Sequence, residues 1–317
     1  MKTAKHRVKF LAMGLALLMV GFLSSEAFAW GFATHAYIAD HLGKTKKIQN
    51  ADEIYGSVAP DTFNYLFDRP DYLGFLSDQT HLEFTKLWNV SNQGLGKSLA
   101  YGFASHNDLW GADSTAHHNG LTFGQGEGYV IAKAALLANA LSQVLADAGL
   151  NVPYEVTFEI SHELLEDGID ILVKNLDPSI GQKLSSSALF RTANFPVLLA
   201  KAYAKDFSQF AGISNRDASK FLIAAEREFR QRIVYYGRAL MQDDATAIQL
   251  IAEGTAEVAT IFLESYGVTL PPEVDIVGLI EFGIEQSISL CADDFAQEIE
   301  ATIDFVNHNL EANGISY

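Results

Sequence analysis

The stretch from Leu222 to Leu240, LIAAEREFRQRIVYYGRAL, contains the pattern that decides the fold class. Its apolar residues recur at steps of three and four, which is the spacing of one face of an α-helix. The residues on this face are Leu222, Ala225, Phe229, Ile233, Tyr236 and Leu240. The segment therefore predicts a long helix with one apolar face.

The same helical period continues through most of the chain, and signals for strands are scarce. Residues 130–148 form an Ala- and Leu-rich run that ends at Gly149, and Pro271-Pro272-Glu273 is a typical start of a further helix. No Asn-Gly or Asp-Gly pair lies between two alternating apolar runs, where it would indicate a β-hairpin. We therefore predict an all-α fold.

The first 29 residues have the pattern of a secretory signal peptide. A basic segment, residues 2–9, precedes the 14-residue apolar run Phe10–Leu23, and Ala27-Phe28-Ala29 offers the small residues that a signal peptidase reads. The run is shorter than the roughly 20 residues that a membrane-spanning helix needs. We expect cleavage after Ala29, export to the periplasm or the medium, and no transmembrane segment in the mature chain.

The composition limits the possible partners. Removal of 29 residues from 317 leaves 288, enough for one substantial core, and removal of three net positive charges from −17 leaves about −20. Such an acidic surface repels nucleic acid, so we expect no stable nucleic acid partner.

Cys291 is the single cysteine, so no internal disulfide forms, and its apolar neighbours indicate a buried residue.

The histidines divide the chain into two parts. Eight follow the signal segment, and seven of these fall between His35 and His162, with His308 outside. Grouped histidines together with acidic residues indicate metal ligation. The chain becomes polar and loses its period around 177–187. We therefore expect a core at 30–176 that carries the site, and a helical extension at 185–317 that packs on it.

Residues 104–118, ASHNDLWGADSTAHH, contain the densest group of candidate ligands. On a continuous helix, steps of 4, 7 and 11 return to one face. His106, Asp113 and His117 would then share a stripe with Trp110, whereas Asp108 would point away from it. We expect the stripe to bind metal.

A second pair, His162 and Glu166, stands at positions i and i+4 of a predicted helix, where both side chains can reach one ion. A zincin protease motif would need histidine at position 166, so the protease interpretation fails.

Three further motifs complete a pattern that resembles a known family. They are WGFATH at 30–35, GSVAPD at 56–61 and QTHLEF at 79–84. Followed by the 104–118 segment and the His162 pair, they resemble, in this order, the zinc-dependent phospholipase C family. They also resemble the phospholipase C/D domain of glycosylphosphatidylinositol-cleaving enzymes, and the single-strand-specific zinc nucleases share the ligand scheme. The resemblance covers about residues 30–176.

This resemblance implies a multi-helix phospholipase C-like bundle with additional C-terminal helices and two to three Zn²⁺ ions. One ion would be held by the amino and carbonyl groups of Trp30, by His35 and by Asp113. A second would be held by Asp61, His81, His106 and the bridging Asp113, and a third by His117, His162 and Glu166. Imidazole and carboxylate together suit zinc.

The spacing within 104–118 departs from the family pattern. Bacillus-type phospholipases place three residues between the helix histidine and the aspartate, and five between that aspartate and the next histidine. Here the gaps are six and three. Asp108 therefore remains an alternative to Asp113, and His118 an alternative to His117.

The resemblance implies metal-assisted hydrolysis of a phosphodiester, with Asp61 as general base. We expect cleavage of a phospholipid headgroup. A single-strand nuclease-like phosphodiesterase is the alternative enzyme, disfavoured by the acidic charge. A non-catalytic metal- or lipid-binding protein on the same fold is the alternative from another class.

Overall fold

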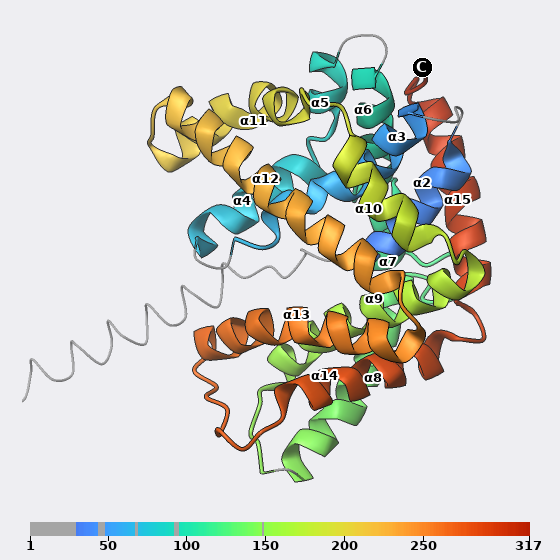
Figure 1. The fold of residues 1–317 in the computed structure, drawn as a ribbon, viewed down its shortest axis with the longest axis vertical. Helices are drawn as coiled ribbons and strands as arrows, with labels where there is room; N and C mark the ends of the chain where they lie inside the picture. The colour runs from blue at the N-terminus through green and yellow to red at the C-terminus, as the bar shows by residue number, and fades with distance from the viewer. Residues whose placement is uncertain (1–29, 44–47, 67–68, 92–94, 148) are drawn as a thin grey trace, which may run out of the picture.

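The computed structural model describes residues 30–43, 48–66, 69–91, 95–147 and 149–317. Within these ranges the chain forms fourteen α-helices and one 3₁₀ helix, and no strand (Figure 1). The predicted all-α class is confirmed. The predicted signal peptide, residues 1–29, lies outside the described residues.

The helices are joined by connections that are mostly short. The earlier part of the chain forms α2 (Phe32–Leu42), α3 (Ile48–Val58), the 3₁₀ helix η1 (Ala59–Phe63), α4 (Pro70–His81), α5 (Thr85–Val90), α6 (Leu95–His106), α7 (Ala112–His117), α8 (Tyr129–Asp147) and α9 (Tyr154–Leu176). The later part forms α10 (Ile180–Phe190), α11 (Phe195–Ala211), α12 (Asn215–Leu240), α13 (Asp244–Ser265), α14 (Ile276–Cys291) and α15 (Phe295–Ala312).

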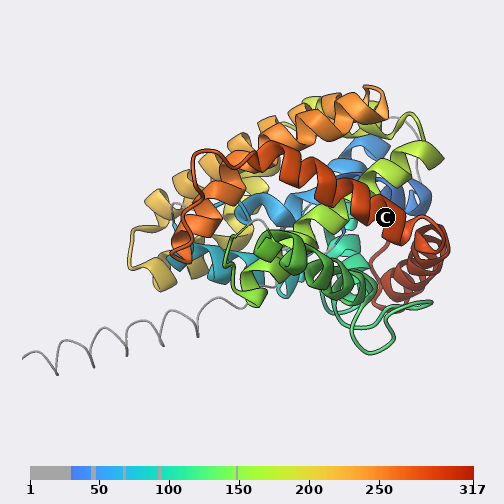
Figure 2. The same cartoon turned by 90° about the horizontal axis from the view of Figure 1, so that it is seen from below.

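One hydrophobic core joins the two parts of the chain. The helix α12 buries Leu222, Phe229 and Ile233, as its period predicts, and packs against α10, α11 and η1. The helix α14 packs on α8 and α9, and α15 on α2, α6 and α7. Figures 1 and 2 show α13 and α14 side by side, with α8 and α9 in the same part of the molecule. Helices of the predicted extension thus contact the segment that carries the motifs, while the division into domains remains a prediction.

Two local predictions need correction. The helix α14 begins at Ile276, because Asp275 accepts a hydrogen bond from the amide of Gly278, whereas Pro271 starts a turn closed by the amide of Val274. The polar stretch 177–187 is mostly helical, since α10 begins at Ile180. The helix α8 ends as predicted, with Gly149 following it at φ +77°.

Close packing of α3 on α6 sets the geometry of the candidate site. A Cβ atom at Gly102 would lie 2.0 Å from the carbonyl oxygen of Glu53, and one at Gly56 would lie 2.2 Å from that of Leu99. The two glycines therefore allow the backbones to touch. This contact brings the end of α3 against the end of α6, where His106 lies.

By length and composition alone, α8 and α13 could cross a membrane. Both contribute residues to the core, such as Leu137 in α8 and Ile251 in α13, and about a third of each apolar window is buried inside the molecule. Core helices of this kind satisfy the same criteria as membrane spans, so the observation favours neither environment.

Candidate metal centre

The predicted continuous helix over 104–118 is wrong, because the chain breaks at 107–111. The Oδ1 atom of Asn107 accepts hydrogen bonds from the amides of Leu109 and Trp110 at 3.0 Å, which ends α6 at His106. A Cβ atom at Gly111 would lie 2.5 Å from the carbonyl oxygens of both His106 and Asn107, so glycine is needed where α7 begins.

The break divides the predicted stripe into two groups. His106, the last residue of α6, meets Asp113 in the first turn of α7, with 2.9 Å between Nε2 and Oδ2. His117, at the other end of α7, contacts Asp108 instead, with 3.1 Å between Nδ1 and Oδ1. Asp108 therefore does not point away as predicted, and it lies with His117 and His118 rather than with His106.

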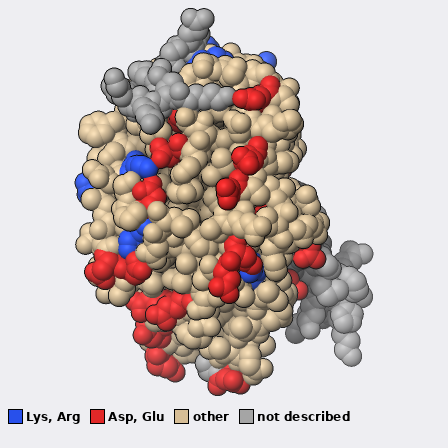
Figure 3. Space-filling model, turned by 90° about the vertical axis from the view of Figure 1, so that its right-hand side faces the viewer, with Lys and Arg blue, Asp and Glu red and all other residues tan. Residues whose placement is uncertain are grey.

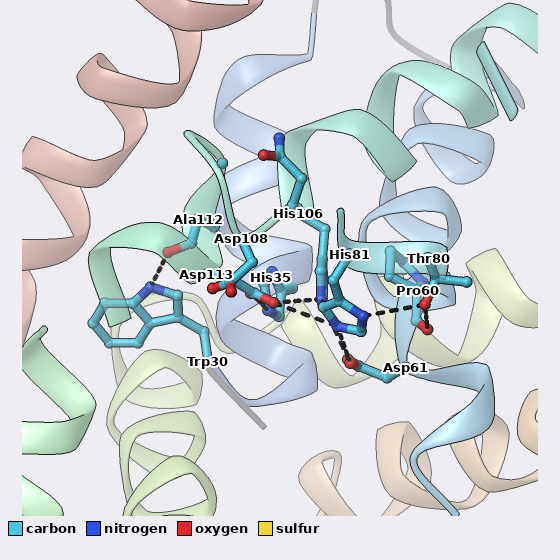
Figure 4. Close-up of polar contacts among 12 residues, drawn as sticks. Trp30, His35, Pro60, Asp61, Thr80, His81, His106, Asp108, Ala112 and Asp113 are labelled. Carbon is cyan, nitrogen blue, oxygen red and sulfur yellow. Dashed lines mark hydrogen bonds and ion pairs between the residues drawn. The ribbon is translucent and has the colours of Figure 1, made fainter. Parts of the chain in front are cut away.

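Five of the predicted ligands come together in one buried cluster (Figure 4), which we call the central cluster: His35, Asp61, His81, His106 and Asp113. They come from five elements, α2, η1, α4, α6 and α7. All five are at most 6% exposed, so water competes little with the contacts among them. Helices far apart in the sequence thus create a site that no single segment contains.

Asp113 faces both sides of the central cluster. Its Oδ1 lies 3.1 Å from Nε2 of His35, whereas its Oδ2 lies 2.9 Å from Nε2 of His106 and 3.5 Å from that of His81. Asp61 completes the second side, with Oδ1 3.3 Å from Nε2 of His81. Two groups of three ligand atoms, His35-His106-Asp113 and Asp61-His81-His106, thus lie close enough to hold an ion, and they share His106.

The ring orientation of two histidines is set by backbone carbonyls. Nδ1 of His106 donates to the carbonyl of Ser57 at 2.7 Å, and Nδ1 of His81 donates to that of Ser77 at 2.8 Å. A carbonyl accepts and never donates, so each Nδ1 carries the hydrogen. Histidines that bind metal commonly direct their second nitrogen to such a partner.

The same two rings place their Nε2 atoms 3.0 Å apart. Two bare nitrogen lone pairs repel at this distance, so a positive charge must lie between them. Burial lowers the pKa of His106, but the Asp113 and Asp61 carboxylates raise it well above the usual range, so in the metal-free chain a proton on this ring is favoured. A metal ion can take the place of that proton, since neutral imidazole is the form that binds metal.

The two carboxylates of the central cluster remain charged despite burial. Burial is the largest single influence and raises the pKa of both Asp61 and Asp113, but the charges and hydrogen bonds of the facing histidines together lower it, and the pKa of Asp113 lies well below its usual range. For His35, burial lowers the pKa and the neighbouring His106 adds to the effect. The cluster thus combines charged carboxylates with imidazoles, a donor set that suits zinc.

Several buried atoms of these residues make no hydrogen bond with any described residue. They are Nε2 of His35, both carboxylate oxygens of Asp113, Nε2 of His162 and Oε1 of Glu166. Their contacts are the imidazole–carboxylate pairs given above, which do not have hydrogen-bond geometry, although buried polar atoms are almost always hydrogen-bonded. A metal ion is the partner that imidazole and carboxylate share, so the residues present fit bound zinc.

A second cluster lies at the far end of α7. His162 and Glu166, one turn apart on α9, have Nε2 and Oε1 at 3.1 Å, and the ring of His117 lies 5.4 Å from that of His162. Asp108 joins this group through His117 and also contacts His118 at 2.8 Å. The His118 side chain is 51% exposed, so His117 is the histidine turned inward.

Trp30 stands at the start of the described chain, beside the central cluster (Figure 4). Its indole nitrogen donates to the carbonyl of Ala112 at 3.0 Å, and its ring stacks on Tyr129 at 5.4 Å. The side chain thus anchors the residue against α7. Ligation by its amino group requires the predicted cleavage and remains a prediction.

Three acidic residues on α9, Glu163, Asp167 and Asp170, were not predicted from the sequence, whereas Glu166 was. Asp170 accepts hydrogen bonds from the amides of Ala33 and Thr34 at 2.7 and 2.8 Å, and so fixes the start of the helix that carries His35. A helical stripe could have revealed it, because Asp170 follows Glu166 by four residues and His162 by eight. The acidic residues that follow His162 on this helix are Glu163, Glu166, Asp167 and Asp170.

These carboxyls hold protons more strongly than usual. Burial, followed by the neighbouring carboxylates, raises the pKa of Glu163 to about 7 and places that of Glu166 well above its usual range. Burial also raises the pKa of Asp170 to about 6. Acidic groups gathered in this way favour a bound cation, which would relieve their mutual repulsion.

A cavity of about 490 Å³ lies beside these groups, between α9, α12 and α13; its wall mixes charged and polar side chains with apolar ones, and we call it the polar cavity. Phe32 and Tyr65 form part of its wall, three residues before His35 and four residues after Asp61. Tyr236 also lines it and donates to Asp167 and Asp170 at 2.9 and 3.0 Å. None of the five residues of the central cluster lines this cavity. Burial raises the pKa of Tyr65 and of Glu163 in its wall, and both lie close enough to the central cluster for the Asp61 carboxylate to raise it further.

Comparisons with known proteins identify no relative. No family model, no curated protein and no solved structure matches this chain. The function must therefore be inferred from the chemistry of the site.

Proposed function

We propose that this protein is a zinc-dependent phosphoric diester hydrolase, whose substrate is a phospholipid with a cleavable headgroup. The observation that carries the proposal is the pair His81 and His106. Their Nε2 atoms lie 3.0 Å apart, while carbonyls hold both Nδ1 hydrogens on the other side of the rings. The arrangement calls for a cation between them, and Asp61 and Asp113 supply the opposing charge.

The residues named above would hold two ions at the central cluster and a third between His117, His162 and Glu166. Zinc, when bound, lowers the pKa of water toward neutrality and neutralises charge on phosphoryl oxygens. We assign the amino group of Trp30 to the ion beside His35. The order of the motifs, which resembles the zinc-dependent phospholipase C family, supports these assignments.

The chain's own side chains orient the reacting groups. Asn64 donates from Nδ2 to Oδ1 of Asp61 at 2.8 Å and fixes the carboxylate that we assign as general base. A carboxylate in this role accepts the proton of the attacking water. Thr80 donates to the carbonyl of Pro60 at 2.9 Å and so couples α4, which carries His81, to η1.

The adjoining cavity supports a phosphodiester as substrate. Among the described residues that line it, Arg232 is the one cation beside Glu163, Glu228 and Glu257, and its guanidinium lies 5.0 Å from the centroid of the Tyr65 ring. Guanidinium groups pair well with phosphate. Figure 3 shows a face on which acidic side chains prevail, and the formal charge of the chain is −17. Long nucleic acids are repelled by such a surface, so we favour a lipid substrate.

Metal analysis and a panel of phosphodiesters test the proposal. Purified without chelator, the processed protein should contain zinc and release the phosphorylated headgroup of a short-chain phospholipid. Hydrolysis of single-stranded DNA in preference to lipid would support the nuclease-like alternative. Bound zinc with no hydrolysis of any diester would leave the non-catalytic metal- or lipid-binding alternative.

A further inference from the structure

A second, smaller cavity lies on the outer side of α9, where α13 and α14 cover it. Its volume is about 80 Å³, and its wall is almost entirely apolar. Leu164, Ala259 and Ile280 form its buried side, and Val258 and Phe262 lie half-buried at its edge. We call it the apolar slot. It is narrow, and its volume is well above the 10–15 Å³ or so that one water molecule needs.

The apolar slot continues the polar cavity beside the central cluster. Three residues, Glu163, Thr255 and Val258, line both spaces. The Oε2 atom of Glu163 is buried and makes no hydrogen bond with any described residue. The surface therefore changes from polar to apolar at this junction, with an unpaired polar atom at the boundary.

This arrangement selects the chemistry of an occupant. A narrow apolar space suits an unbranched alkyl chain, because each methylene removed from water contributes about a fourfold gain in binding. The junction suits a polar linkage such as an ester, and the wider cavity suits a charged head. The occupant is thus one molecule with a polar head and an alkyl chain.

We infer that the apolar slot holds an alkyl chain of the substrate while the phosphodiester lies in the polar cavity near the central cluster. The part of the inference that concerns the reaction rests on the proposed function. The binding of an alkyl chain in the apolar slot does not. It assigns a role to α13 and α14, which lie in the segment that the family resemblance does not cover. A free fatty acid carries the same chemistry and is the second possible source.

Filling the apolar slot tests the inference. Ala259→Phe places a ring in the slot, and Ile261→Phe, on the exposed face of the same helix and outside both cavities, is the matched control. We expect Ala259→Phe to lower kcat/KM for a dihexanoyl phospholipid by about tenfold or more, which is the effect of displacing two or three methylenes. A chromogenic diester with the same head and no acyl chain should keep its kcat/KM within about twofold.

An equal loss on both substrates, or none on either, in a folded Ala259→Phe variant would overturn the inference. If that variant does not fold, Phe262→Ala provides the second test, since it widens the slot. The ratio of kcat/KM for dioctanoyl over dihexanoyl lipid should then rise, by up to about fourfold for each methylene newly buried. An unchanged ratio would also overturn the inference.

Direct binding separates this inference from the proposed function. A fluorescent fatty acid below its micellar concentration should bind to the wild type and to Ile261→Phe, and much more weakly to Ala259→Phe. Binding of the fatty acid without hydrolysis of any diester would refute the proposed function. It would support the inference that the apolar slot binds an alkyl chain, with free fatty acid as the source of that chain. Hydrolysis at a rate that does not depend on acyl-chain length, without binding of the fatty acid, would refute the inference about the apolar slot. It would leave the proposed function supported.

Discussion

Asp113 and His106 lie 2.9 Å apart although six residues separate them, because the helix breaks between them. On a continuous helix Asp113 would lie on the same face as His106 but about 10 Å further along the axis, out of reach of its ring. The break instead lets Asp113 turn one oxygen to His106 and the other to His35. The bridging carboxylate of the proposed metal centre thus depends on the turn at 107–111.

Metal content gives the first prediction. We expect at least two tightly bound zinc ions per processed chain, measured by elemental analysis. His162→Ala should lose about one ion, because His162 lies in the second cluster and not in the central one. His308→Ala, which changes an exposed histidine on α15, should lose none. A chain that takes up no zinc even on reconstitution would contradict the proposal.

Zinc removal should also lower the stability of the fold. A ligand present at 1,000 times its dissociation constant stabilises the native state by about 4 kcal/mol. Chelation should therefore lower the midpoint of thermal unfolding, and added zinc should restore it. Equal midpoints with and without chelator would indicate that the clusters bind no metal.

The two aspartates of 104–118 should differ in their effects. Asp113→Asn should weaken the binding of both ions at the central cluster. It should also reduce the hydrolysis rate to below roughly one part in a hundred, because Asp113 is a proposed ligand and not only a neighbour of one. Asp108→Asn should weaken only the ion near His117, by roughly 10- to 100-fold, because it acts through the orientation of that ring. Zinc titration of both variants measures the difference, and the reverse order would refute the assignment.

The free amino group of Trp30 gives a further prediction. A backbone amine has a pKa of roughly 8, so zinc can displace its proton at neutral pH once cleavage has released it. A Met-Gly extension before Trp30 should therefore weaken one zinc site and nearly abolish hydrolysis. The comparison requires zinc content and rate for extended and accurately processed chains. Equal values would show that this amine is not a ligand.

The turn before α7 gives a prediction about stability. Gly111→Ala places a Cβ atom 2.5 Å from two carbonyl oxygens, so we expect a loss of about 1–3 kcal/mol in the free energy of unfolding. Gly74→Ala on α4 is the matched control, because nothing lies within 4 Å of the added atom. It should be neutral or stabilising by up to about 1 kcal/mol, since alanine favours a helix. Urea unfolding of both variants measures the difference.

The sequence by itself determined the helical class, because burial of apolar residues at steps of three and four is a local property of each segment. The faces of α12 and α8 and the burial of Cys291 follow from it. The five residues of the central cluster are among the nine candidate ligands that the order of the motifs indicated. Each motif was local, and the five meet because the helices that carry them pack together.

Tertiary structure alone decided how the candidate ligands divide between clusters. The break at Asn107 and Gly111 comes from hydrogen bonds and close backbone contacts that helical periodicity does not record. The break separates His117 from His106. It also brings Asp108 into contact with His117, which a continuous helix would have turned away from it. The anchoring of α2 by Asp170, 137 residues beyond Ala33, likewise depends on the packing of α9 against α2. Such contacts join distant segments through burial, and no pattern within one segment specifies them.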